Sequence, residues 1–73
     1  MMNRVKGYRN MLNLNQTELS KQLGITPQSL SAKENGKRQF TDREKIYLLK
    51  LFRKVDPDLN LEKLFFAEKV SKS

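Results

Sequence analysis

The chain has 73 residues and a mass of 8.6 kDa, which is enough for one small domain but not for a deep cleft between domains. It contains no Cys and no His, which excludes a disulfide framework, the usual zinc sites and catalysis by Ser-His or Cys-His pairs. The mean hydropathy of -0.74 and the lack of a long apolar run exclude a transmembrane helix. The first residues lack the apolar stretch of a signal peptide, so we expect a cytoplasmic protein. We also expect no metal or other cofactor, because the chain has no Cys or His to bind one in the usual way.

The charge of the chain is basic and unevenly distributed. Fifteen Lys and Arg stand against eight Asp and Glu, a net charge of +7. Residues 1–40 carry +5 of this excess, and residues 41–73 carry +2. Such a balance indicates a polyanionic partner, nucleic acid before an anionic membrane surface, although net charge can also serve solubility alone.

Apolar residues recur at helical spacing and no segment alternates as a strand would, which predicts an all-α fold. The first helix is expected over residues 3–12. Its apolar stripe consists of Val5, Tyr8, Met11 and Leu12. Core packing is the default for Tyr8, with a hydroxyl contact to a partner as the less favoured alternative.

A second helix is expected after Asn15, which can cap it together with Glu18 three positions later. Gly24 can end that helix in the left-handed conformation. Almost at once Thr26 can cap a third helix, with Pro27 at its first position. Two short helices joined by a tight turn with a leading Gly form the helix-turn-helix pattern.

The third helix, over residues 27–34, is short and polar, with Leu30 as its one clear core residue. In a helix-turn-helix the second helix enters the major groove of DNA. The amide of Gln28 suits adenine, and Ala32 one turn later suits a thymine methyl. No Asp or Glu, which phosphates would repel, occurs in residues 19–33.

The remainder of the chain predicts two more helices. Thr41 and Glu44 form a second capping box at the start of the fourth helix. Its expected inner face consists of Ile46, Leu49 and Val55, widened by Leu48 and Phe52. Tyr47 is expected in the core by default, and Phe40 as an apolar staple before the cap. Asp56 and Asp58 flank Pro57, where a turn role is preferred over an acid pair. Asn60 can cap a fifth helix, with Leu59 and Leu64 as its staple.

Two segments go beyond this general pattern. Residues 16–26 read QTELSKQLGIT, and residues 34–37 read ENGK, with Leu30 between them. At this spacing they resemble the lambda-repressor-like helix-turn-helix family of phage repressors, Cro proteins and small bacterial regulators. The resemblance covers about residues 3–66.

The resemblance implies a compact bundle of four or five short helices, all-α, that binds operator DNA as a symmetric dimer. The DNA-binding domain would span residues 1–66, with the motif at about 16–34 and a loose tail at 67–73. A homodimer on a palindromic double-stranded operator and a bacterial or phage-encoded repressor are the corresponding expectations.

The resemblance also implies roles for single residues. Gln16 would contact a phosphate while bracing the recognition helix, and Arg9 and Glu34 would form a partly buried ion pair. Lys33 stands where relatives often carry an apolar residue, so its stem is expected to pack while its ammonium reaches a phosphate. The expected base-reading residues are Gln28, Ser29, Ser31 and Ala32. The expected phosphate contacts are Asn15, Gln16, Lys33, Asn35, Lys37 and Arg38. The expected dimer contacts on the last helix are Leu61, Phe65 and Phe66.

Two alternatives to a DNA-reading regulator stay open at this point. One is an antitoxin-type autoregulator that uses the same DNA surface and holds a protein partner with the last helix. The other is a protein-interaction module of the same fold that reads no DNA. An enzyme is not expected, because the Asp, Glu, Ser and Lys residues lie on the surface with nothing to perturb them.

Overall fold

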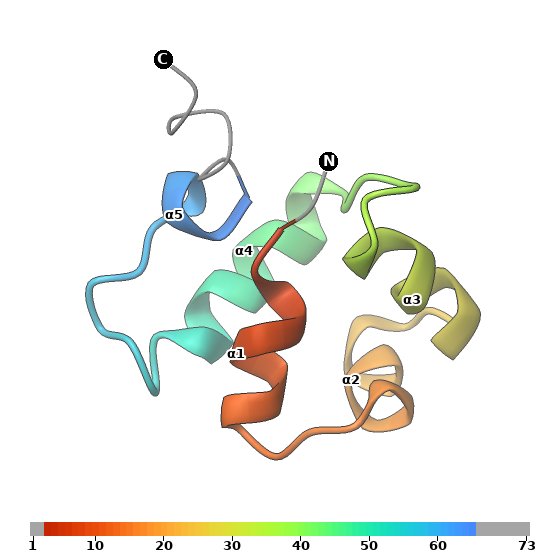
Figure 1. The fold of residues 1–73 in the computed structure, drawn as a ribbon, viewed down its shortest axis with the longest axis horizontal. Helices are drawn as coiled ribbons and strands as arrows, with labels where there is room; N and C mark the ends of the chain where they lie inside the picture. Colours follow the sequence, from red (N-terminus) through yellow and green to blue (C-terminus); the bar gives the residue numbers. More distant parts are fainter. Residues whose placement is uncertain (1–2, 66–73) are drawn as a thin grey trace.

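Five helices make up residues 3–65, the part of the chain that the computed structural model describes (Figure 1). They are α1 (Val5–Met11), α2 (Gln16–Leu23), α3 (Pro27–Glu34), α4 (Asp42–Phe52) and α5 (Leu61–Phe65). The described residues contain no strand, so the predicted all-α bundle is confirmed. The tail predicted at 67–73 lies outside them.

Capping residues set most of the helix boundaries. At the start of α2, Asn15 Oδ1 accepts a hydrogen bond from Glu18 N at 2.7 Å, and Glu18 Oε1 accepts one from Asn15 N at 3.0 Å. Thr41 and Glu44 form the same reciprocal box at the start of α4. Gly24 ends α2 at a φ of 74°, where a side chain would be strained. These boundaries agree with the sequence predictions.

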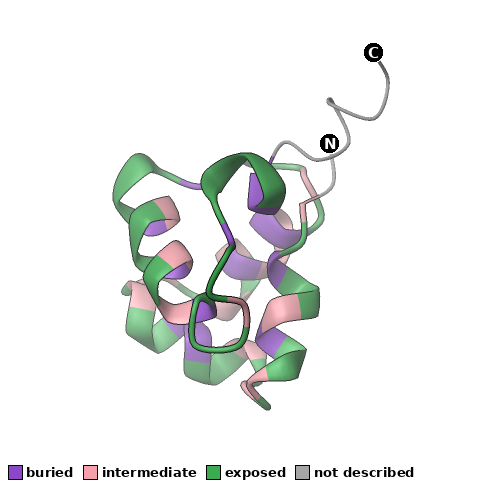
Figure 2. Ribbon diagram, turned by 90° about the vertical axis from the view of Figure 1, so that its left-hand side faces the viewer, coloured by how far each residue is buried: buried purple, intermediate pink, exposed green. Residues whose placement is uncertain are grey.

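The core is a single apolar cluster enclosed by the helices, which Figure 2 shows as the buried faces that point inward. In chain order its buried members are Val5, Leu19, Leu30, Phe40, Leu48, Phe52, Leu59, Leu64 and Phe65. The ring of Tyr8 stacks on Phe52 at 5.4 Å between centroids, which joins α1 to α4. The predicted staple residues Leu59 and Leu64 are both fully buried.

The predicted inner face of α4 is correct in part. Leu48 and Phe52 are fully buried and Leu49 packs against the core, as predicted, but Ile46 is 51% exposed, and Val55 and Tyr47 are exposed as well. The fully inward face consists of Glu44, Leu48 and Phe52, which are spaced four residues apart. Glu44 belongs to the cap of α4, and its side chain is also buried as part of the inward face of the helix.

Two further apolar side chains, Met11 and Phe40, differ in their burial. Met11, expected on the inner stripe of α1, is 63% exposed because α1 ends at that residue and the chain turns away. Phe40, expected as a staple, is buried in the core, where it packs on Phe65 of α5 with 5.7 Å between ring centroids. Within residues 3–65, no helix has both the length and the apolar character needed to cross a membrane.

Candidate nucleic-acid interface

The two helices of the motif are joined by the tight turn at residues 24–26. Ile25 N donates to Ser20 O at 3.0 Å, and Gly24 N donates to Lys21 O at 3.2 Å, so the turn closes directly onto the end of α2. Thr26 Oγ1 then accepts from Ser29 N at 3.1 Å and starts α3. This arrangement places α3 at one edge of the molecule, on the side opposite α5 (Figure 1).

The outer surface of α3 carries the predicted base-reading side chains. Gln28 is exposed, and within residues 3–65 its amide has no hydrogen-bond partner. Ser29, Ser31 and Ala32 are half-buried, whereas Leu30 is fully buried. An exposed and unengaged Gln amide can both donate and accept, as bidentate recognition of adenine requires.

A basic loop follows α3 and folds back onto its last turn. Lys37 N and Arg38 N both donate to Ala32 O, at 2.9 and 3.3 Å. Gly36 has a φ of 80°, which lets the chain reverse at this point. The side chains of Asn35, Lys37 and Arg38 are exposed, so the structure brings these three predicted phosphate contacts together beside α3.

A buried polar network connects α1, α2 and α3. Arg9 Nε donates to Glu34 Oε2 at 2.8 Å, and Gln16 Nε2 donates to Glu34 Oε1 at 3.0 Å. Arg9 also donates to the carbonyl of Leu14 at 2.9 Å, in the connection between α1 and α2. Gln16 therefore braces α3 directly, and one N–H of its amide remains for a phosphate. The side-chain oxygen of Asn15 is engaged in the α2 cap, although the residue is exposed.

The prediction of a phosphate contact by Lys33 is wrong. This residue is only 6% exposed, and its Nζ donates to both carboxylate oxygens of Glu44, at 2.8 and 3.0 Å. The ammonium also lies 5.9 Å from the centre of the Phe40 ring. Because a buried cation needs a partner inside the protein, Lys33 faces α4 rather than the surface.

Two opposing effects act on the pKa of the Glu44 carboxyl. Burial raises the pKa of the Glu44 carboxyl, but the hydrogen bonds and positive charge of Lys33 and the hydrogen bonds of Thr41 outweigh it. The net result is a pKa below the ordinary 4.5. Glu44 is therefore an anion at neutral pH, as the ion pair with Lys33 requires.

The predicted dimer contacts on α5 divide into three outcomes. The prediction of a dimer contact by Phe65 is wrong, since this residue is only 7% exposed and packs on Phe40 in the core. Leu61 is exposed and can meet a partner. Phe66 lies outside the described residues.

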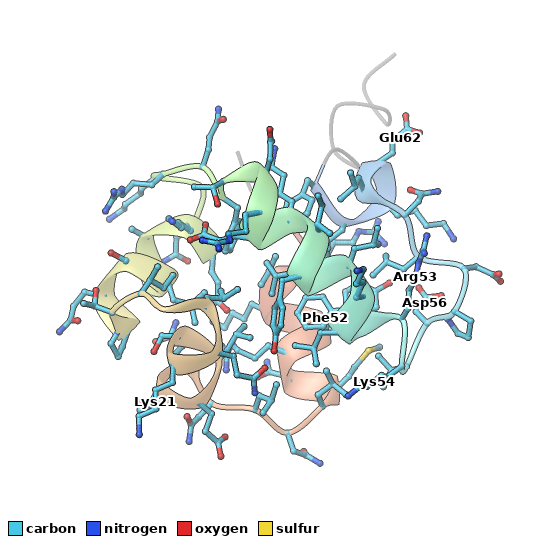
Figure 3. All side chains as sticks on the ribbon, turned by 180° about the vertical axis from the view of Figure 1, so that it is seen from behind. Lys21, Phe52, Arg53, Lys54, Asp56 and Glu62 are labelled. Carbon is cyan, nitrogen blue, oxygen red and sulfur yellow. The ribbon has the colours of Figure 1, made fainter. Side chains whose placement is uncertain are left out.

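Two polar contacts between distant residues had no clear signal in the sequence. Tyr8 Oη donates to Asp56 Oδ2 at 2.6 Å, which occupies the hydroxyl. Asp56 lies in the connection after α4 (Figure 3). Tyr47 Oη donates to Gln22 Oε1 at 2.6 Å, across the surface between α4 and α2. The Tyr47 hydroxyl thus joins two helices, and the Tyr8 hydroxyl joins α1 to the connection after α4.

A family model described as a helix-turn-helix domain matches residues 2–65, which include every described helix. No curated protein and no solved structure matches the chain. The family match supports DNA binding by this domain.

Proposed function

The chain belongs to the helix-turn-helix domain family, and we propose that it is a repressor-like transcriptional regulator that recognises a specific double-stranded DNA sequence. In this proposal α3 enters the major groove and α2 crosses the phosphate backbone. The narrower likeness to phage repressors and Cro proteins is part of the same proposal.

The observation that carries the proposal is the composition of the α3 surface. Gln28 is exposed with a free amide, and the one acid of α3, Glu34, is buried in an ion pair. The exposed cations Lys37 and Arg38 stand immediately beyond the helix. A groove-facing helix without exposed acid, next to cations placed for the backbone, separates base reading from phosphate binding as DNA recognition requires.

We further propose that the chain binds as a symmetric dimer. A recognition helix of eight residues reads only a few base pairs, and a dimer doubles the site with half-sites about 34 Å apart. The exposed Leu61 on α5 is the described member of the predicted interface. The same DNA surface would serve an antitoxin-type autoregulator, which differs by holding a second protein.

The experiment that tests the proposal is a selection of binding sites from a random duplex library at near-physiological salt. An enriched palindromic motif is the expected result. The affinity for the selected site should fall with salt at a log–log slope of roughly -5, if about six phosphates are neutralised per dimer. Absence of any enriched motif would contradict sequence-specific recognition and favour the protein-interaction module.

Two variants then separate the two kinds of contact. Gln28→Ala should cost about 1–3 kcal/mol on the selected site and relax the preference at one base pair. Lys37→Ala should weaken binding to all sequences alike and flatten the salt slope by about one. Lys54→Ala, which removes an exposed cation after α4, away from both α3 and α5 (Figure 3), is the matched control and should change neither.

A further inference from the structure

Two buried ion pairs meet at the last turn of α3, on consecutive residues. Glu34 reaches Arg9 of α1 and Gln16 of α2, whereas Lys33 reaches Glu44 of α4. Consecutive helical residues point about 100° apart, so the two pairs pull on α3 from different directions. Asn3 adds a third contact by donating its side-chain Nδ2 to Lys33 O at 3.0 Å.

The apolar attachment of α3 is small by comparison. Leu30 is its one fully buried apolar side chain, and Pro27 and Ala32 are half-buried. A helix of eight residues is marginal on its own, so its neighbours must hold it. One apolar contact can anchor α3, but the polar contacts have the directionality needed to set its rotation and tilt.

The acceptor of the second pair is itself fixed in place. Glu44 Oε1 accepts from Lys33 Nζ at 2.8 Å and from Thr41 N at 3.0 Å, while Oε2 accepts from Lys33 Nζ at 3.0 Å. The carboxylate is therefore held by the capping box of α4 and cannot follow Lys33 if α3 turns. The pair connects the end of the recognition helix rigidly to the start of α4.

We propose that Lys33 and Glu44 are positioning residues that set the angle at which α3 presents Gln28 to DNA. This inference rests on the proposed function. Gln28 lies five residues from Lys33, about 7.5 Å along the helix, so a tilt of about 10° about that end moves Gln28 by about 1 Å. The side chains of a binding site must be held within about 0.5 Å of their productive positions, so such a movement would weaken base recognition.

The variant that tests this is the double substitution Lys33→Met with Glu44→Gln. Met keeps the aliphatic volume of the Lys stem, and Gln keeps an oxygen for Thr41 N, so the α4 cap is retained. One cation and one anion are lost together, so the net charge is unchanged. The control is Lys50→Met with Glu62→Gln, which makes the same change at two exposed residues.

The measured quantities are the unfolding midpoint and the ratio of the Kd for random DNA to the Kd for the selected site. A buried ion pair contributes little net stability, but the new amide leaves a buried N–H2 without a partner, so the double variant should stay folded with a midpoint somewhat below that of the wild type. The ratio should fall roughly tenfold, since a displaced bidentate contact is worth about that factor or more. The Kd for random DNA should not change. A wild-type ratio in a folded double variant would overturn the proposal.

Two further measurements keep the inference separate from the proposed function. Residual dipolar couplings of the α3 amides report the angle of α3 to α1 in the free protein, and they should change in the double variant but not in its control. If the wild type selects no DNA site, only the proposed function is contradicted. If the couplings are also unchanged in the double variant, the positioning role is contradicted as well. If the double variant does not fold, Glu44→Gln alone is the second variant: it keeps the oxygen that accepts from Thr41 N and replaces the other by an N–H2 that cannot accept from Lys33, so it must show the same changes in smaller degree.

Discussion

The helices α3 and α4 are attached to the same core by different kinds of interaction. The eleven-residue α4 buries Leu48 and Phe52 completely and is capped by a reciprocal box. The eight-residue α3 buries one Leu completely and is held by two buried ion pairs and a single cap. Apolar burial gives much of the stability and little direction, whereas ion pairs give direction and little net stability.

This difference explains how the chain combines a polar surface helix with a stable fold. A recognition helix needs polar side chains outside, and an eight-residue helix has little room left for apolar ones. The interior charges of Lys33 and Glu34 compensate for that shortage by fixing α3 to three other helices. The comparison makes predictions that differ between the two helices.

The largest effect is expected from Phe52→Ala in α4. Phe52 is fully buried and stacks on Tyr8, so its truncation leaves a cavity and should cost about 3–5 kcal/mol of unfolding free energy. Denaturant unfolding measures this loss. The exposed Ile46→Ala, in the same helix, should cost less than about 0.5 kcal/mol. Equal losses from the two substitutions would show that the core is not where the structure places it.

The next effect is expected from Arg9→Met, which removes the ion pair that holds α3 to α1. Glu34 would remain buried with only the Gln16 amide as a partner, so the loss should be about 3 kcal/mol. Hydrogen exchange should show that the α3 amides lose more protection than those of α4. Lys21→Met, which changes an exposed cation on α2 that points outward in Figure 3, is the control and should leave both unchanged.

The same division explains what could be predicted from the sequence. Local signals were sufficient for the starts of α2, α3 and α4, because Asn15, Thr26 and Thr41 act on residues three positions away. The ends were less well predicted, since α1 is shorter than the expected 3–12 and α4 stops at Phe52, before Val55. Long-range polar contacts have no such local signal. Arg9 and Glu34 are 25 positions apart, and their pairing was expected only from a family resemblance.

The errors have the same physical origin. The sequence offers a local role for each of Lys33 and Glu44, a snorkelling stem and a cap, but no sign of their contact across 11 positions. Apolar periodicity likewise leaves the buried Glu44 out of the inner face of α4 and brings in the exposed Ile46 and Val55. Charged residues at interior positions are therefore the point at which apolar periodicity stops predicting this fold.

A smaller effect is expected where the connection after α4 is joined to α1 by a polar contact. Tyr8→Phe keeps the stacked ring and removes the hydrogen bond to Asp56, at a cost of about 1.5 kcal/mol. The hydrogen bond to Asp56, burial and the Asp56 charge raise the pKa of Tyr8 above its ordinary 10.0. The folded state thus holds this proton more tightly than the unfolded state. Stability from Tyr8 is present below pH 10.0 and is lost as the pH rises through the raised pKa.

A denaturation series between neutral and strongly alkaline pH checks this prediction. The wild type should lose stability at the alkaline end, and Tyr8→Phe should lose less because the titrating group is gone. Tyr47→Phe is the control, since it removes a tyrosine hydroxyl that is bonded to Gln22 on the surface. If Tyr8→Phe and wild type had parallel alkaline curves, the Tyr8–Asp56 contact would not contribute to stability.

The smallest effect compares the N-terminal caps of the two helices. Thr26→Ala and Thr41→Ala each remove one side-chain acceptor, and each should cost about 1 kcal/mol of unfolding free energy. Their effects on DNA binding should differ. Loss of the Thr26 cap loosens the first turn of α3, where Gln28 lies, so affinity for the selected site should fall several-fold. Thr41→Ala keeps the backbone N–H that holds Glu44 Oε1, and α4 is also held by Leu48 and Phe52, so that affinity should stay at the wild-type value. A similar loss of affinity in both variants would mean that DNA binding follows stability alone, and that α3 has no special dependence on its directional contacts.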